Sequence, residues 1–214
     1  MIDVSKKPIV IIGQGPSAYQ LADHIEEVRD KNVIWASLNR FDIIQDDILD
    51  LIGRKLDIVY CSSVQRKQEV GQDLNDFLYP VDDRPTLFIT DKMSNPLLLN
   101  DRIFLSQWGF GFSSIFAMLC ALGKLGAEKI IMIGFDGFAA HDGQVYFGQD
   151  KINDNFEARR RSIWRDTVIM NRFFWEYWEH IGLAWDQTEI INLSGSSITC
   201  FKRLAIQQII REEI

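Results

Sequence analysis

The segment Lys129–Ile133, which reads KIIMI, is apolar at every position after the first and is followed directly by Gly134. A strand with one face in water alternates apolar and polar residues, whereas a parallel strand covered on both faces is apolar throughout. A run this short is also of typical strand length rather than helix length. The segment therefore predicts a buried strand in a parallel sheet, and such a sheet requires helices on both of its faces.

Similar short apolar runs alternate with helical patterns along the whole chain. Further strands are expected at Pro8–Ile12, Val33–Ser37, Leu56–Cys61, Thr86–Thr90, Ile103–Leu105 and Glu189–Leu193. Helices are expected from Ser17 onward, at Ile43–Ile52, Ser63–Phe77, Ser113–Leu125 and Phe156–Gly182, and after Ser197. This alternation predicts an α/β fold with a doubly wound, mostly parallel sheet. With 214 residues, we expect residues 1–214 to form a single Rossmann-like domain, in which the loop 135–157 is a candidate lid.

Charge and cysteine content narrow the class of protein. The net charge of -7 argues against a dedicated nucleic-acid-binding protein, which usually carries a basic excess. The three cysteines are far apart and lack the spacing of metal ligands, so we expect neither a disulfide framework nor a metal site. No signal-peptide pattern or bilayer-length apolar run is present, so we expect a cytoplasmic protein whose only membrane contact would be peripheral.

The first loop, Gly13-Gln14-Gly15-Pro16-Ser17, follows the first predicted strand and precedes a helix. In parallel sheets ligands bind at the carboxyl ends of the strands, so this loop is a candidate nucleotide site. A dinucleotide loop is disfavoured, because Pro16 and Ser17 interrupt the pattern and no acidic residue ends the second strand. The amides of Gly15 and Ser17 would instead face a phosphate at the helix start. The alternative is a tight turn with Ser17 as a helix cap.

Small or polar residues also follow the other predicted strands. The amide of Asn39 suits a ribose hydroxyl or a base edge, although a turn asparagine is the alternative. Two serines open the central helix, where capping requires only one of them. Asp136 could hold a nucleotide hydroxyl, bind a metal or cap a turn, but no second carboxylate at D-x-D spacing supports the metal. The candidate nucleotide- or donor-binding residues outside the first loop are therefore Asn39, Ser62, Ser113, Ser114, Gly134, Phe135 and Asp136.

The second half of the chain contains two further candidate functional features. Because histidine side chains in general titrate near neutral pH, His141 is a candidate proton carrier, or simply an exposed loop histidine. The cluster Arg159–Arg161 near the start of the long helix could bind phosphate, or form a solvated helix face. The same helix carries many aromatic residues, which favour core packing or, alternatively, a homo-oligomer interface or an acceptor platform. The aromatic residues are Trp164, Phe173, Phe174, Trp175, Tyr177 and Trp178.

The ordered set of motifs resembles the bacterial sialyltransferases that use CMP-sialic acid, together with the motility accessory and 6-hydroxymethylpterin diphosphokinase-like Rossmann family. The motifs are the G-x-G-P-S loop, the asparagine after the second strand, the helix SSIFAMLCALGKLGAEKI and the segment IIMIGFD. The resemblance implies that Gly13, Gly15, Ser17 and Asn39 contact the nucleotide. It also implies that Ser113 and Ser114 lie near the donor phosphate or carboxylate, with Gly134 and Asp136 at the base-binding end. Tyr146 would contact the leaving phosphate.

The chain departs from that family at two places. The family has Thr-Ser-Gly where this chain has Ser113-Ser114-Ile115, and its histidine general base has no counterpart near Arg159–Arg165. The candidate catalytic residues are therefore Tyr146, His141 and Arg161, and the base is open. The leading hypothesis is a glycosyltransferase that uses a CMP-linked sugar donor and acts on a surface glycan or glycoprotein. The alternatives are a pterin-type diphosphokinase using Mg²⁺-ATP, and a non-catalytic nucleotide- or sugar-binding protein.

Overall fold

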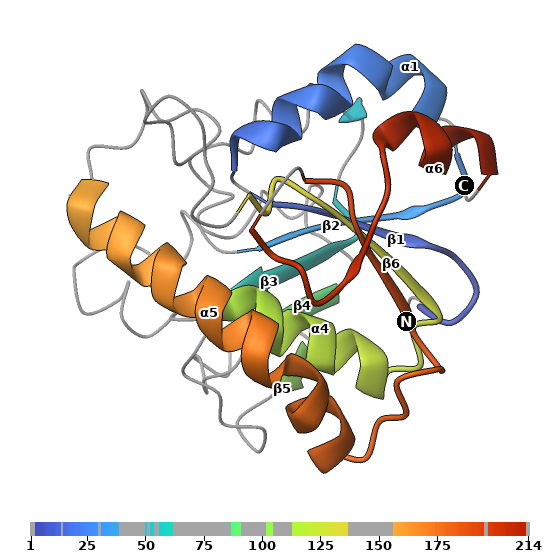
Figure 1. Ribbon diagram of the computed structural model, residues 1–214. Helices are drawn as coiled ribbons and strands as arrows, with labels where there is room; N and C mark the ends of the chain where they lie inside the picture. The colour runs from blue at the N-terminus through green and yellow to red at the C-terminus, as the bar shows by residue number, and fades with distance from the viewer. Residues whose placement is uncertain are drawn as a thin grey trace.

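The described part of the chain forms a parallel sheet with helices on both faces (Figure 1). The computed structural model describes residues 3–13, 15–29, 31–38, 50, 52–53, 56–61, 87–90, 102–104, 113–136, 156–194 and 197–212. Within these residues the eight strands are β1 Ile9–Ile12, β2 Ile34–Leu38, β3 Ile58–Cys61, β4 Leu87–Thr90, β5 Arg102–Phe104, β6 Lys129–Ile133, β7 Glu189–Asn192 and β8 Lys202–Arg203. The helices described are the 3-10 helix η1 Pro16–His24, α1 Ile25–Val28, α4 Ser114–Lys124, α5 Phe156–His180 and α6 Ile206–Glu212.

The sheet has the order β5-β4-β3-β2-β1-β6-β7-β8, and all of its neighbouring strands are parallel. The chain first builds outward from β1 to β5, and then returns to place β6 on the other side of β1. In register, Ile12 of β1 lies between Ser37 of β2 and Ile133 of β6. The strand order therefore reverses between β1 and β6, which is the topological switch point of the sheet. The predicted doubly wound, parallel α/β architecture is confirmed.

One face of the sheet is covered by α4 and α5 (Figure 1). A helix that is apolar on all sides must be buried, and every residue from Ile115 to Gly123 in α4 is buried. From α5, Phe174 and Trp178 are fully buried, and Phe174 packs edge-on against Phe116 with ring centroids 5.1 Å apart. Burial of a large apolar side chain of this kind contributes about 2–3 kcal/mol. The aromatic side of α5 is therefore core where it faces α4.

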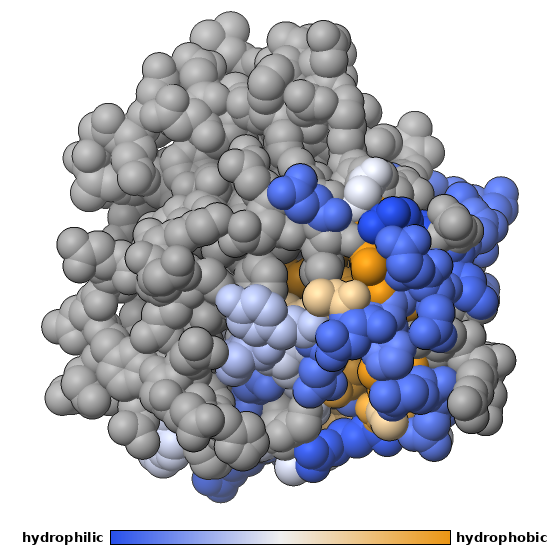
Figure 2. Space-filling model, turned by 90° about the horizontal axis from the view of Figure 1, so that it is seen from above, coloured by the Kyte–Doolittle hydropathy of each residue, from blue (hydrophilic) through white to orange (hydrophobic). Residues whose placement is uncertain are grey.

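The other face carries η1, α1 and α6, which pack over a second core. Its strand residues alternate with those of the first core: Val10 and Ile12 point to this face, whereas Ile9 and Ile11 point to the other. Viewed from the side of α1 and α6, the described surface is mainly hydrophilic with a small apolar area (Figure 2). Both faces of the sheet are thus buried, as the continuous apolar strands predicted.

Two elements differ from the sequence expectation. The first helix begins as a 3-10 helix at Pro16 and becomes α-helical only at Ile25. The final helix begins at Ile206 rather than just after Ser197, because Ile198 and Phe201 are buried in the first core and the short strand β8 follows them. The strand β8 has two exposed residues, and so leaves no apolar pattern in the sequence.

Other expected elements lie mostly beyond what the structure describes. The helix expected at Ser63–Phe77 falls outside the described residues, as does Ile43–Ile52 apart from residues 50 and 52. The candidate lid, 135–157, is described only at its two ends. Among the helices of the described ranges, none combines the length and the apolar character needed to cross a bilayer.

Candidate functional site

The candidate site lies where β1 and β6 end side by side. The loop after β1 contains Gly13 and Gly15 and leads into Ser17 at the start of η1, and the loop after β6 contains Gly134 and Asp136. Open α/β sheets bind ligands in the crevice at such a reversal of strand order. The fold therefore brings two of the sequence-predicted loops together at the position that the topology favours, although more than a hundred residues separate them along the chain.

The two loops cross in close backbone contact, and this contact explains their glycines. A Cβ atom on Gly15 would meet the carboxylate of Asp136, and would lie 2.6 Å from the carbonyl oxygen of Gly134. A Cβ atom on Gly134 would lie 2.6 Å from the carbonyl oxygen of Gly13, and Gly134 also has a φ of +80°. Side chains cannot occupy such positions without moving a backbone. We refer to Gly13, Gly15–Ser17 and Gly134–Asp136 together as the glycine junction.

Ser17 and Asp136 bond the glycine junction together. The amide and the hydroxyl of Ser17 both donate to Asp136 Oδ2, at 3.1 and 2.9 Å. The same hydroxyl accepts a hydrogen bond from the amide of Gly134 at 3.0 Å. The N-cap of η1 is Gly15, which has no side chain with which to cap the helix. Asp136 therefore supplies the cap from another loop, and its negative charge lies at the helix end that favours anions.

The β7 side holds the loop after β6 in place. Ser194, the second residue after β7, accepts a hydrogen bond from the amide of Phe135 at 2.8 Å and is itself buried. The amide and hydroxyl of Ser197 both donate to the carbonyl oxygen of Asp136 at 3.4 Å. Asn192 in turn orients Ser194, because its side-chain oxygen accepts from the Ser194 amide at 3.0 Å. The segment after β7 thus fixes the backbone at Phe135 and Asp136.

The expectation that the amides of Gly15 and Ser17 face a phosphate is wrong. The Gly15 amide donates to the carbonyl oxygen of Gly134 at 2.7 Å, and the Ser17 amide donates to Asp136. Pro16 has no amide hydrogen, and the amide of Ala18 donates to Gly15 at 3.0 Å. The Gly15 and Ser17 amides are therefore satisfied by the loop after β6, which lies against them in the folded protein. The glycines therefore allow the backbone of another loop to approach closely. A glycine pattern in the sequence is the same whether a loop or a ligand makes this approach.

The start of α4 is the second predicted anion site. Ser113 is the N-cap residue, and its side chain makes no capping hydrogen bond within the described part of the chain. Ser113 and Ser114 are both half-buried. A helix start with two hydroxyls suits an anion in general terms, so a role for these serines in donor binding stays a prediction.

Several predicted site residues lie outside the described residues. These are Gln14, Asn39, Ser62, His141 and Tyr146. Arg161 lies in α5, but the described part of that residue does not include its side chain. Farther along this helix, Arg165 contacts the carboxylate of Asp166 at 3.0 Å. Roles for these residues therefore stay predictions.

The described thiols are poor nucleophile candidates. Burial raises the pKa of Cys120 to about 12, and it raises the pKa of Cys200 to about 12 as well. A thiol is nucleophilic only as the thiolate, so both groups are inert at neutral pH. No group of three or more metal-ligating side chains occurs among the described residues.

Two further serines, neither of them a predicted binding residue, hold the strand ends at the site. Ser194 holds Phe135, and Ser37 in β2 donates from its buried hydroxyl to the carbonyl oxygen of Ile12 at 2.9 Å. Ser37 is the only polar residue in the otherwise apolar β2, and Ser194 follows a buried strand. Both positions could therefore have been recognised from the sequence as polar residues near the strand ends. What the sequence lacked was the partner of each hydroxyl.

Comparison of the chain with protein-family models, curated proteins and solved structures gives no match. The family resemblance noted from the motifs therefore stays a prediction.

Proposed function

We propose that the protein is a transferase that binds a nucleotide-activated donor at the carboxyl ends of β1 and β6. Within that class we propose a cytoplasmic glycosyltransferase that uses a CMP-linked sugar of the sialic-acid type. The observation that carries the proposal is the glycine junction, which places the loops of Ser17 and Asp136 at the switch point of the sheet. The order of the sequence motifs supports the choice of donor.

The proposed reaction transfers the sugar from the CMP phosphate to an acceptor hydroxyl, and different residues act on the leaving phosphate and on the proton. The bond between the sugar and the CMP phosphate breaks, the acceptor hydroxyl oxygen forms the new bond, and a base takes its proton. Hydrogen-bond donors and cations stabilise the charge that develops on the leaving phosphate. We assign that task to Ser113 and Ser114 at the start of α4, with Tyr146 and Arg161. His141 is the candidate for the base, since histidine is the side chain most often used for proton transfer in catalysis.

Nucleotide binding to the intact chain tests the proposal. A ligand that binds only the folded state stabilises it by about 2.7 kcal/mol at a concentration one hundredfold above its Kd. We expect CMP to raise the melting temperature equally with and without Mg²⁺, and UDP, GDP and ATP to have smaller effects. Ser113→Ala with Ser114→Ala should reduce the CMP response. Asp3→Ala is the control that should leave the CMP response unchanged, because Asp3 lies before the amino end of β1, away from the carboxyl ends of the strands.

Three outcomes would overturn this choice. A response only to Mg²⁺-ATP would replace the glycosyltransferase with the pterin-type diphosphokinase, in which Asp136 would serve as a metal ligand. The absence of a response to any nucleotide would remove the nucleotide-donor proposal. A response to CMP without transfer from any CMP-sugar would leave a binding protein without catalysis.

A further inference from the structure

We propose that Asp136 closes the start of η1 to phosphate, and so determines which part of a ligand can lie at the loop after β1. The inference rests on the proposed function only in assuming that a phosphorylated ligand binds at this edge of the sheet. In this proposal Asp136 is a specificity-determining residue, because its own carboxylate takes the position that a ligand phosphate would otherwise occupy.

The first step is the position of the carboxylate. One oxygen, Asp136 Oδ2, accepts both donors that Ser17 presents at the helix start, at 3.1 and 2.9 Å. The residue before Ser17 is Pro16, which has no donor, and the residue after it is Ala18, whose amide is bonded to Gly15. A phosphate at this helix start would need these same donors, so Asp136 already fills the anion position.

The second step is that the backbone carrying the carboxylate is held in place. The carbonyl oxygen of Asp136 accepts from both the amide and the hydroxyl of Ser197, and the preceding amide, of Phe135, is bonded to Ser194. On the other side, the backbone of Gly15 lies against the carboxylate so closely that a Cβ atom there would collide with it. The segment after β7 therefore holds the backbone of Asp136, and Ser17 and Gly15 hold the carboxylate against the start of η1.

The third step is electrostatic. A carboxylate offers only acceptors and carries the same charge sign as phosphate, so it repels the group that the helix end would otherwise attract. Ligand groups that donate hydrogen bonds, such as sugar hydroxyls or a base amine, are compatible with this position. The glycine junction therefore directs the phosphate of a donor away from η1.

The test is a titration of the full chain with inorganic phosphate, followed at the Ser17 amide in two-dimensional NMR spectra. In the wild-type protein we expect no phosphate-dependent shift of this amide. In Asp136→Ala the two donors of Ser17 become free, and we expect its amide to shift as phosphate is added. Asp136→Ser, which keeps a polar group at this position, gives the same expected shift if the alanine variant does not fold.

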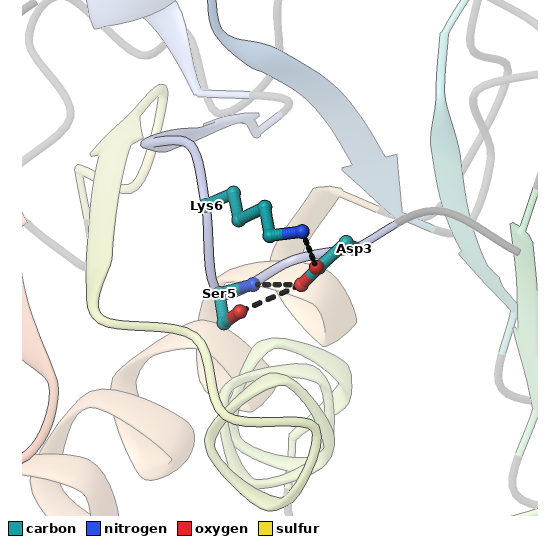
Figure 3. A network of polar contacts seen from close by, with 3 residues as sticks. All are labelled: Asp3, Ser5 and Lys6. Atoms are coloured by element: carbon teal, nitrogen blue, oxygen red, sulfur yellow. Dashed lines mark hydrogen bonds and ion pairs between the residues drawn. The ribbon is translucent and has the colours of Figure 1, made fainter.

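The control is Asp3→Ala. Asp3 also accepts from the amide and hydroxyl of a serine, Ser5, but in a turn before β1 (Figure 3). Its removal changes the net charge by the same amount, and should leave the Ser17 amide insensitive to phosphate. A shift in the wild-type protein, a shift in this control, or no shift in the folded Asp136 variants would each overturn the inference. Failure of the proposed function is seen separately, as the lack of any thermal response to nucleotides.

Discussion

The turn before β1 and the glycine junction each pair an aspartate with a serine, through almost the same hydrogen bonds. In the turn, the amide and hydroxyl of Ser5 donate to Asp3 Oδ1 at 3.1 and 2.6 Å, and Lys6 lies 2.9 Å from Asp3 Oδ2 (Figure 3). In the junction, the corresponding atoms of Ser17 donate to Asp136 Oδ2 at 3.1 and 2.9 Å. The partners are 2 residues apart in the first pair and 119 in the second.

This difference in separation decides what each pair does. Residues two apart meet in the unfolded chain as well, so the exposed Asp3–Ser5 contact forms and breaks without the rest of the fold. Ser17 meets Asp136 only after β1 and β6 have paired, and Ser17 is buried there. The same chemistry is therefore a local turn in one place and a joint between distant loops in the other.

The sharpest way to break the junction is to add side chains to its glycines. Gly134→Ala combines a φ of +80° with crowding by the backbone of Gly13, and we expect it to lower the free energy of unfolding by about 3–5 kcal/mol. Gly126→Ala is the matched control, because it has a φ of +85° but its nearest neighbour, the Ser5 Cβ, is 3.9 Å away. It should cost about 1–2 kcal/mol. If urea unfolding shows that Gly134→Ala and Gly126→Ala lose the same free energy of unfolding, crowding at the junction is unimportant.

Removing the two carboxylates compares the pairs directly. Asp136→Ala deprives the helix start of its cap and leaves the buried Ser17 without its acceptor, so we expect a loss of about 2 kcal/mol in unfolding free energy. Asp3→Ala should leave the urea midpoint unchanged, since the turn is exposed and local. The comparison fails if the two variants unfold at the same urea concentration.

Alkaline pH extends the contrast between buried and exposed groups to Cys120. Burial raises the pKa of this thiol from 9.0 to about 12, so above pH 9 the unfolded state releases a proton that the folded state retains. Stability is therefore lost as pH rises above 9, by about 1 kcal/mol per thiol over the first pH unit. Cys120→Ala should unfold with a shallower pH dependence in this range. An unchanged slope would show that the thiol is accessible to solvent.

The smallest effect is expected at acid pH, in the exposed pair. Hydrogen bonds from Ser5 and Lys6 lower the pKa of Asp3 from 3.8 to about 2. Any contribution of this group to stability is present above pH 3.8, and is lost as pH falls through about 2. NMR titration of the Asp3 carboxyl group should give the lowered pKa, and Ser5→Ala should return it toward 3.8. A normal pKa in the wild-type protein would mean that the turn is open in solution.

Much of the fold was predictable from local patterns. Strands β1 and β6 are apolar at nearly every position, and each was placed within one residue of its observed bounds. The two-residue β8 was missed because pairing with β7, rather than any apolar pattern, makes it a strand. The late start of α6 was missed because Ile198 and Phe201 are buried by the first core instead of continuing a helix.

The candidate site was predictable in its position but not in its contacts. Loop composition and strand order place Gly13–Ser17 and Gly134–Asp136 at one edge of the sheet. Nothing local to Gly15 shows whether a ligand or the backbone of Gly134 lies against it. The sequence by itself determined that strands are buried on both faces and that small residues follow them. Only the tertiary structure decided that Asp136 fills the helix start, because that contact requires β1 and β6 to pair across 119 residues of chain.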